Sequence, residues 1–381
     1  MHRVIQLTPA GVKKVIKSIP GAIGLRDRLY GRPKGQRPAK GSLRPVVYLP
    51  TWLEWDVMKQ RPQYLLEAFA KAGHPVWFVD PRLKETPERV GKINLVRSLR
   101  LTPPSDVILY THFAPTRTLL GGYKRMAVVY DLLDDLTIYD SEETGLSSER
   151  TARHHHDILV HEADVVIVSN PLLIERHRHE RADMILVENG VDTMQFIPDG
   201  PVADNLPEGP IVGYHGAIAQ WFDFDLVAGL AEMRPDLSIV LVGPVNSEVA
   251  DRASDIGEIA NIHLFPAQPT ERVVSFVRRF DVGFIPFVVN EMTMAVTPLK
   301  MYEYLACQVP VVAAPLPACV AHPSVVTAVD ADAFSAAIDD AMSFDSARRA
   351  GFRRNAEKAS WDQRISILIG RLDELGLRRV P

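Results

Sequence analysis

The sequence predicts an α/β protein made of two doubly wound domains. Short runs of Val, Ile and Leu alternate with segments of helical periodicity, which is typical of parallel sheets covered by helices on both faces. The chain has 381 residues, more than the roughly 250–300 that one hydrophobic core usually supports. The alternating pattern also stops at residues 197–209 and then begins again, so we expect two domains of similar size.

The composition excludes several classes of protein. Hydrophobic residues make up 46% of the chain and charged residues 24%, so it is neither disordered nor fibrous. No apolar run in the sequence reaches the ~18–20 residues that a membrane-spanning helix needs. The formal net charge of −4 gives no overall basic signature for nucleic acid. Two cysteines, Cys307 and Cys319, are too few for a disulfide framework and favour a reducing compartment.

Positive charge is concentrated near the N-terminus. Residues 1–45 hold eleven Lys or Arg and one Asp, a net charge of +10, which leaves −14 for the rest of the chain. Val12, Val15 and Ile16 fall at helical spacing beside lysines. We therefore expect residues 1–44 to be a basic lead-in, flexible or amphipathic. Two interpretations stay open: a mobile basic tail, and a segment that makes peripheral contact with an anionic membrane through residues 1–45.

The first domain is expected over residues 45–196. Helices are predicted over 61–73, where Gly73 ends the pattern, and over about 142–163. Its predicted strands are continuous apolar runs at 45–50, 76–80, 93–96, 107–110, 127–130, 164–169 and 184–187.

The second domain is expected over residues 210–360, after a linker at 197–209 that holds three prolines and two glycines. A last helix begins at Trp361, within residues 361–381. The predicted strands are 211–214, 237–242, 262–265, 282–286 and 309–313, and the predicted helices are 224–233, 271–278, 299–306 and 331–342.

This architecture indicates where a ligand binds. In open α/β sheets, ligands bind beyond the carboxyl ends of the strands. In the loop after the first strand of the second domain, Gly216 allows a close approach of backbone to ligand, and Ala217 leaves room beside it. Ile218 and Trp221 of the same loop are further candidates for binding. The alternative is a plain strand-to-helix turn, because the loop lacks the GxGxxG pattern.

A stronger signal is the run from Thr297 to Val312. Pro298 suits the first turn of a helix, so the free amides near Thr297 and Leu299, together with Lys300, form an anion site. Glu303 lies one turn further along, where a carboxylate accepts two hydroxyl hydrogen bonds. A helix N-terminus can bind phosphates and a carboxylate can bind a ribose diol, so this pair of features suits a nucleotide ligand. The alternative is a solvated helical face.

These motifs, in this order and spacing, resemble the GT-B glycosyltransferases, especially the large family-4-like group (group 1). The residues that carry the resemblance are 189–192 (NGVD), 297–306 (TPLKMYEYLA) and 310–312 (PVV). Residues 61–65 (RPQYL) and 129–134 (VYDLLD) resemble a bacterial subgroup associated with surface polysaccharides. The resemblance covers about residues 45–375 and implies two Rossmann-like domains facing a central cleft.

The resemblance implies a nucleotide-sugar donor held mainly by the second domain and a glycan or lipid-linked glycan acceptor held mainly by the first. Glu303 matches the second glutamate of the family's E-x7-E motif, whereas Ala295 occupies the position of the first. The basic pair that relatives place after the first strand of this domain is replaced by His215 and Trp221, so Lys300 and the helix amides carry more of the diphosphate charge. The final helix, from Trp361, resembles the one that crosses back to the first domain. No cofactor and no essential metal are expected.

Three loops of the first domain are expected to supply acceptor contacts. Trp52, Glu54 and Arg61 lie in or after the loop that follows the first strand. Trp52 and Trp55 of this loop either stack on a sugar or pack internally. His112 matches in position a histidine that often faces the donor sugar in the family; the alternative is a structural histidine. Asp131 either binds sugar hydroxyls or caps a helix.

The mechanism depends on stereochemistry. An inverting transfer needs a general base, for which Asp56, His112 and Asp134 are the candidates. A retaining transfer lets the leaving diphosphate take the proton, and the family-4-like resemblance favours retention. In both cases Lys300 and the helix end stabilise the leaving group.

Two further signals have structural interpretations. Adjacent histidines at 154–156 point to different sides of a helix, so a solvated helix face is expected rather than a metal site formed with His161. Cys307 is expected to be packed, and Asp223 to cap the helix that follows it.

The sequence therefore predicts a glycosyltransferase of bacterial surface-polysaccharide or glycolipid assembly. We expect it in the cytoplasm, with peripheral contact at the inner face of the cytoplasmic membrane as an open alternative. A non-catalytic sugar-nucleotide-binding scaffold and a nucleotide-sugar epimerase on the same fold remain the competing functions.

Overall fold

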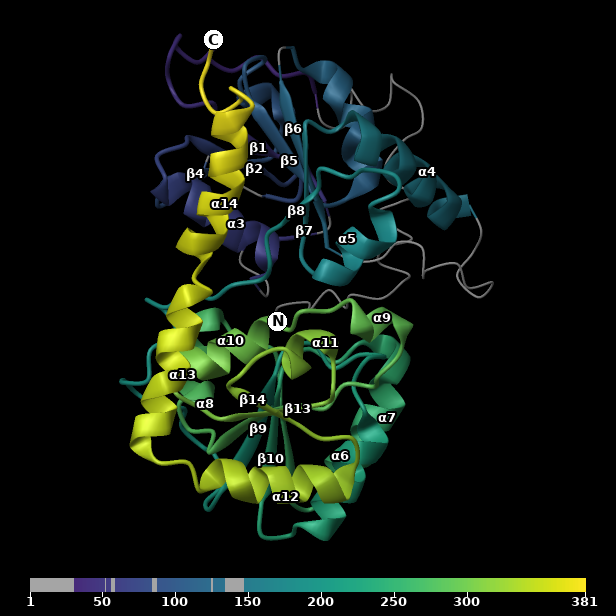
Figure 1. The fold of residues 1–381 in the computed structure, drawn as a ribbon, viewed down its shortest axis with the longest axis vertical. Helices are drawn as coiled ribbons and strands as arrows, with labels where there is room; N and C mark the ends of the chain where they lie inside the picture. The colour runs from purple at the N-terminus through teal and green to yellow at the C-terminus, as the bar shows by residue number, and fades with distance from the viewer. Residues whose placement is uncertain (1–30, 52, 56–58, 84–87, 125, 134–146) are drawn as a thin grey trace. The chain divides into compact units, whose positions relative to one another are not determined.

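The computed structural model describes residues 31–51, 53–55, 59–83, 88–124, 126–133 and 147–381. The chain forms two compact units (Figure 1). Of the described residues, the first unit comprises those from 31 to Glu188 together with Trp361–Pro381, and the second unit comprises Asn189–Ser360. No helix of the described residues is long and apolar enough to cross a membrane.

The first unit is built on a sheet with the strand order β3-β4-β2-β1-β5-β6-β7-β8. Every pair in it is parallel except β3 with β4. Six of its strands are apolar runs that are almost entirely buried, as strands covered on both faces are. The strands are β1 (Val46–Tyr48), β2 (Val76–Val79), β3 (Glu88–Val90), β4 (Ile93–Val96), β5 (Ile108–Thr111), β6 (Ala127–Leu132), β7 (Val165–Val168) and β8 (Ile185–Leu186).

Helices pack on this sheet where its connections cross over. Helix α3 (Arg61–Lys71) contacts β1, β2 and β4, while α4 (Ser147–Glu162) contacts β6 and α5 (Pro171–His177) contacts β7 and β8. Pro62 stands at the start of α3, where its missing N–H costs no hydrogen bond. At the other end Gly73 has a φ of +93°, which a side chain disfavours, so the chain turns there into β2.

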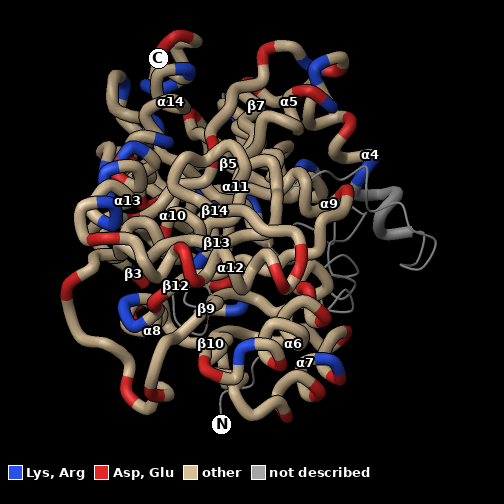
Figure 2. The backbone as a smooth tube through the Cα atoms, turned by 60° about the horizontal axis from the view of Figure 1, so that its bottom comes forward, with Lys and Arg blue, Asp and Glu red and all other residues tan. Residues whose placement is uncertain are grey.

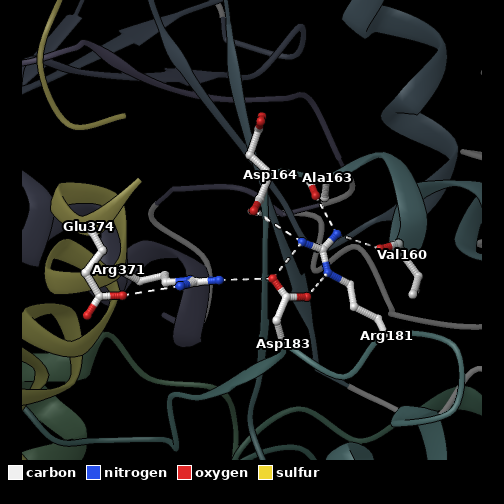
Figure 3. Close-up of polar contacts among 7 residues, drawn as sticks. All are labelled: Val160, Ala163, Asp164, Arg181, Asp183, Arg371 and Glu374. Carbon is white, nitrogen blue, oxygen red and sulfur yellow. Dashed lines mark hydrogen bonds and ion pairs between the residues drawn. The ribbon is translucent and has the colours of Figure 1, made fainter. Parts of the chain in front are cut away.

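The last helix, α14 (Trp361–Glu374), belongs to the first unit. The Trp361 ring stacks on Tyr64 of α3, with 5.3 Å between the ring centroids. Arg371 of α14 reaches Asp183, 3.0 Å away, and Asp183 is also held by Arg181. Figure 3 shows this chain of contacts, in which Arg181 also donates to the carbonyls of Val160 and Asp164 at the end of α4. A cation at a helix C-terminus is favourable because it meets the negative end of the helix dipole.

The second unit contains a wholly parallel sheet with the strand order β11-β10-β9-β12-β13-β14. The strands are β9 (Ile211–His215), β10 (Ser238–Val242), β11 (Ile262–Phe265), β12 (Val282–Ile285), β13 (Val311–Ala313) and β14 (Val325–Thr327). The helices are α6 (Phe224–Met233), α7 (Ala250–Gly257), α8 (Thr270–Val277), α9 (Glu291–Met294), α10 (Leu299–Ala306), α11 (Pro317–Val320), α12 (Ala331–Met342) and α13 (Ser346–Lys358).

Helix α13 is rich in arginine and packs against α10. Figure 2 shows the run of basic residues along it. Arg353 is not merely a surface charge, since its guanidinium donates to the carbonyl of Ala306 at the C-terminal end of α10, 2.9 Å away, and to the carbonyl of Phe196. This contact fixes the end of the helix that carries Lys300 and Glu303.

The observed architecture confirms the predicted α/β class with two doubly wound units. The segment 197–209, expected as a linker, lies on the second unit, where Ala203 is buried and Arg278 donates to the carbonyl of Ile197. The chain passes between the units at Glu188 and again after Ser360. Seven of the strands and α-helices named above were not predicted: β3, α5, α7, α9, α11, β14 and α13.

Candidate functional site

The second sheet has a topological switch point between β9 and β12. From β9 the chain proceeds to β10 and β11 on one side, and from β12 it proceeds to β13 and β14 on the other. Ligands of open α/β sheets bind in the crevice at this point, beyond the carboxyl ends of the two strands. Gly216 follows β9 there, and Phe287 follows β12.

The loop after β9 is shaped by two glycines. Gly216 has a φ of +120° and Gly243, at the end of β10, has a φ of +155°. A Cβ on Gly243 would lie 2.0 Å from the carbonyl oxygen of Gly216, so only glycine allows the two segments to pack in this way. The amide of Ile218 then donates to the carbonyl of Pro244, 2.9 Å away. The glycine packing and this hydrogen bond hold the loop in one conformation.

Lys300 of α10 lies beside the loop that follows β9. A Cβ on Gly216 would be 3.3 Å from Lys300 Nζ, so a side chain at 216 would crowd the ammonium. The ammonium lies over two aromatic rings, 4.8 Å from the centroid of Tyr214 and 4.7 Å from that of Phe287. Burial lowers the pKa of Lys300 to about 8, although the nearby Glu303 acts in the opposite direction. Tyr214 and Phe287 were missed from the sequence, because Tyr214 lies inside β9 and Phe287 lies two residues after the end of β12.

Glu303 is one turn further along α10 and is 6% exposed. Its Oε2 lies 3.2 Å from Nε2 of His215, the last residue of β9. The His215 ring is itself fixed, edge-on to Tyr304 and stacked on Phe196. The main-chain amide of His215 donates to the Tyr304 hydroxyl, 3.0 Å away. A carboxylate and an imidazole are therefore brought together at the end of the first strand of this unit.

The N-terminus of α10 lies next to Lys300 and has no side-chain cap. Its N-cap residue, Pro298, makes no side-chain hydrogen bond to the first turn. Thr297 is buried, and its carbonyl accepts a hydrogen bond from Asn189 Nδ2 at 2.7 Å, which fixes the segment before the helix. Leu299 is half-buried at the first position of the helix. Uncapped N–H groups and the positive end of the helix dipole favour an anion at this place.

The remaining residues predicted for this site differ in their exposure to solvent. Ala217 is half-buried in the loop, and its carbonyl accepts a hydrogen bond from the Tyr214 hydroxyl at 2.7 Å. Ile218 is buried in the core, so only its backbone is available to a ligand. Trp221 is half-buried with its ring 6.5 Å from that of Phe287. Ala295, which stands where the family has its first glutamate, is buried directly after the short helix α9.

The first sheet has its own switch point, between β1 and β5. Tyr48 ends β1 and His112 follows β5, and the Tyr48 hydroxyl lies 2.9 Å from His112 Nδ1. The Thr51 hydroxyl is 3.1 Å from the same Tyr48 oxygen. Burial, with a smaller effect of the Arg61 charge, lowers the pKa of His112 to about 3, so the ring is neutral at physiological pH.

Arg61 and Asp131, both predicted to contact an acceptor, pair with one another. Arg61 Nε lies 2.9 Å from Asp131 Oδ2, Arg61 Nη2 donates to Asp131 Oδ1 at 3.0 Å, and the two side chains are 3% and 0% exposed. The Tyr110 hydroxyl also donates to Asp131, at 2.6 Å. Asp131 lies within β6, so it does not cap a helix. A buried carboxylate is held by such charge-assisted contacts because leaving it unpaired is costly.

The loop after β1 is described only in part. Glu54 is half-buried, and its carboxylate lies 3.2 Å from Arg82 Nη1. Trp55 is buried with its edge toward Phe78, which supports the packing alternative for that tryptophan. Trp52, Asp56 and Asp134 lie outside the described residues.

The structure corrects the expectation that all the histidines at 154–156 of α4 lie on a solvated helix face. His154 and His161 are exposed, as a solvated helix face requires, but His156 is 2% exposed. Its ring points into the unit because position 156 shares a face with the buried Leu159 and Val160 of the same helix. Two structural interpretations are confirmed: Cys307 is buried, and Asp223 caps α6 by accepting the amide of Leu226.

Comparisons with known proteins show which proteins this chain is similar to. Residues 209–343 match the family model described as glycosyl transferases group 1, and this segment contains Gly216, Lys300 and Glu303. The chain resembles TuaH of Bacillus subtilis (strain 168), a protein named as a teichuronic acid biosynthesis glycosyltransferase, with 29% identity over 241 residues. That alignment covers 57% of this chain and 58% of TuaH, so the chain spans less than two thirds of that relative.

Solved structures confirm the fold. Sucrose-phosphate synthase from Thermosynechococcus elongatus superposes with a TM-score of 0.64 at 17% identity, over 87% of this chain and 99% of that one. Anabaena HepE in complex with UDP and glucose superposes with a TM-score of 0.60 at 13% identity, over 86% and 100%. The chain thus has the GT-B fold, as the resemblance of the sequence predicts, and residues 209–343 of its second unit are similar to group 1 glycosyltransferases.

Proposed function

We propose that this protein is a glycosyltransferase that moves a sugar from a nucleotide-sugar donor to a glycan or lipid-linked glycan during cell-surface polysaccharide biosynthesis. The observation that carries the proposal is the grouping of Gly216, Lys300 and Glu303 at the switch point of the second sheet, inside the segment that matches group 1 glycosyltransferases. TuaH, named for teichuronic acid biosynthesis, supports the assignment to surface polysaccharides.

The grouping suits the two polar ends of a nucleoside diphosphate. Lys300 and the uncapped amides of α10 supply positive charge for the diphosphate. Glu303, with two acceptor oxygens, supplies what a ribose diol binds. Gly216 leaves room for the backbone to approach the phosphates, since a Cβ there would press on Lys300. Because UDP is the nucleotide in the HepE structure, UDP-sugars are the first donors to test.

The reaction we propose breaks the bond between the sugar and the diphosphate and forms one between the same sugar carbon and an acceptor hydroxyl. Negative charge develops on the leaving diphosphate, and Lys300 with the helix amides stabilises it. This arrangement performs the task that a divalent metal has in other transferases, so we propose that transfer needs no metal ion and no cofactor.

We propose a retaining transfer. With a pKa of about 3, His112 takes up a proton poorly near neutral pH, which argues against it as the general base of an inverting reaction. Asp131 is already engaged by Arg61 and Tyr110. In a retaining transfer the leaving diphosphate itself receives the acceptor proton, and His112 acts as a neutral hydrogen-bonding group. The first unit then holds the acceptor, and peripheral membrane contact through residues 1–45 would bring a lipid-linked acceptor to it.

Donor turnover with and without acceptor tests this function against its alternatives. The purified chain is incubated with each UDP-, GDP-, ADP- and TDP-sugar, with or without a lysate-derived glycan or glycolipid fraction, and released nucleoside diphosphate is measured. A transferase releases diphosphate in an acceptor-dependent way. An epimerase converts the donor sugar without any acceptor and releases none. Donor binding with no conversion in either condition favours a non-catalytic scaffold and contradicts our proposal.

A further inference from the structure

A cluster of side chains in the first unit carries an inference of its own. It contains His156 of α4, His177 at the end of α5 and Glu180 in the turn that follows. One ring nitrogen of each histidine and one carboxylate oxygen of Glu180 all lie within 4.8 Å of one another. The two rings meet at 71°, with 5.2 Å between their centroids. We propose that these three residues bind a divalent transition-metal ion, Zn²⁺ by preference.

The ligand set fits zinc. Imidazole nitrogen and carboxylate oxygen are ordinary zinc ligands, and two histidines with one glutamate leave a fourth position for water. His177 Nδ1 and Glu180 Oε2 are 3.1 Å apart. Two ligand atoms on a tetrahedral zinc ion with bonds near 2.0–2.1 Å are about 3.3 Å apart. The His177 nitrogen and the Glu180 oxygen therefore already have nearly the spacing of two neighbouring zinc ligands. The three ligand atoms lie within 4.8 Å of one another, so the His156 nitrogen has to approach the other two by up to about 1.5 Å when an ion binds.

Contacts around the cluster fix the orientation of the histidine rings. The Tyr130 hydroxyl lies 2.8 Å from His156 Nδ1 and thereby directs the other ring nitrogen, Nε2, toward the site. Such an outer partner fixes the orientation of a metal-ligating histidine. His177 is 1% exposed, and its Nε2 has no hydrogen-bond partner among the described residues.

The site also has a route for the ion. Glu180 is 32% exposed, whereas both histidines are buried, so the carboxylate stands at the entrance. His179 Nε2 lies 3.6 Å from the second oxygen of Glu180 and is 72% exposed, which places it outside the cluster. A bound ion would join α4 to the turn after α5 (Figure 1), and both elements flank the inner strands β6 and β7. Its role is therefore stabilisation of the first unit and is separate from sugar transfer.

Zinc titration of the full chain, purified without a histidine tag and stripped with EDTA, tests the proposal. Calorimetry is expected to give one equivalent of bound Zn²⁺, and Co²⁺ in place of zinc is expected to give visible absorption bands of a four-coordinate site. Glu180→Gln and His177→Ala should each weaken zinc binding more than 100-fold, and Tyr130→Phe about 10- to 100-fold. His154→Ala, which removes an exposed histidine from the same helix, is the matched control and should change nothing.

Two results would overturn the site. One is the absence of stoichiometric zinc binding by the wild-type chain. The other is zinc binding that survives both Glu180→Gln and His177→Ala, since the ion would then sit elsewhere. Circular dichroism of each metal-free variant checks its folding. Because Glu180 is partly exposed, Glu180→Gln keeps the test decisive even where His177→Ala fails to fold.

Discussion

Glu303 Oε2 lies 3.2 Å from His215 Nε2, where helix α10 passes the end of strand β9. The two residues are far apart in the sequence, and the topology of the second sheet brings them to one place. Lys300 occupies the turn of α10 before Glu303 and faces Gly216, the residue after His215. A single helix thus presents a cation and a carboxylate to the same loop, which is the geometry on which our account of donor binding rests.

The pKa of Lys300 makes donor binding depend on pH. Lys300 is charged below about pH 8 and becomes neutral above it. A diphosphate binds the charged form, so affinity for nucleoside diphosphates should fall about tenfold between pH 7 and pH 9. Lys300→Met should bind weakly at both pH values and lose this dependence. Lys358→Met, which removes an exposed lysine of the same unit, should behave as wild type. Parallel pH profiles for wild type and Lys300→Met would contradict the assignment.

Gly243 should be essential to the loop that holds Gly216. A Cβ at 243 would meet the Gly216 carbonyl at 2.0 Å, so Gly243→Ala must displace the loop. We expect nucleotide binding to be lost and the melting temperature of the chain to fall. Gly351→Ala is the control, because Gly351 lies in α13 with ordinary space around it, and a helical Gly→Ala change usually stabilises by roughly 0.5–1 kcal/mol. Unchanged nucleotide affinity in Gly243→Ala would show that the loop is not part of the site.

The Arg61–Asp131 ion pair should be costly to break. Both side chains are buried, so Asp131→Asn leaves a guanidinium without its counter-charge, and breaking such a pair destabilises by about 3–5 kcal/mol. The double variant Arg61→Met, Asp131→Leu removes both charges and should recover part of this loss. Asp373→Asn, at the exposed pair with Arg378, should cost less than about 1 kcal/mol. Urea denaturation measures all three, and equal losses for Asp131→Asn and Asp373→Asn would be inconsistent with a buried pair.

Asp183 should make the attachment of α14 sensitive to acid. Hydrogen bonding to Arg181, joined by the charge of Arg371, holds the pKa of Asp183 below its usual range. Folding lowers the pKa of this carboxyl, so its ionised form stabilises the folded state at any pH above its pKa in the unfolded chain, about 3.9. This stabilisation is lost as the pH falls through its pKa in the folded chain. The difference in melting temperature between wild type and Asp183→Asn should therefore be constant at neutral pH and shrink below about pH 4. A difference that grows on acidification would refute this.

Much of the fold follows from local patterns in the sequence. The buried strands of both sheets are continuous apolar runs, and α10 follows from Pro298 and the spacing after it. Strand β3 could not be recognised, since Glu88–Val90 is an exposed edge strand with two charged residues. Helix α13 was missed because it is largely charged and buries only Phe352 and Ala356.

The candidate sites were harder to predict than the elements that carry them. Lys300 and Glu303 follow from helical spacing, but the rings under Lys300 come from β9 and from the residue after Pro286, which only the sheet topology unites. Arg61 and Asp131 were both singled out, yet their pairing across 70 residues carries no local signal. The burial of His156 likewise depends on Tyr130 and His177, which lie on other elements.

The most direct test of our central claim is a calorimetric titration of nucleoside diphosphates into the wild-type chain, Glu303→Gln and Glu232→Gln. Glu232 is an exposed glutamate of the same unit and serves as the matched control. We predict that one nucleoside diphosphate binds selectively. Its affinity should fall 10- to 100-fold in Glu303→Gln, because a hydrogen bond to a charged group contributes about 1.5–3 kcal/mol, and Glu232→Gln should match wild type. Equal affinity in all three proteins, or no binding by any of them, would contradict a donor site at Lys300 and Glu303.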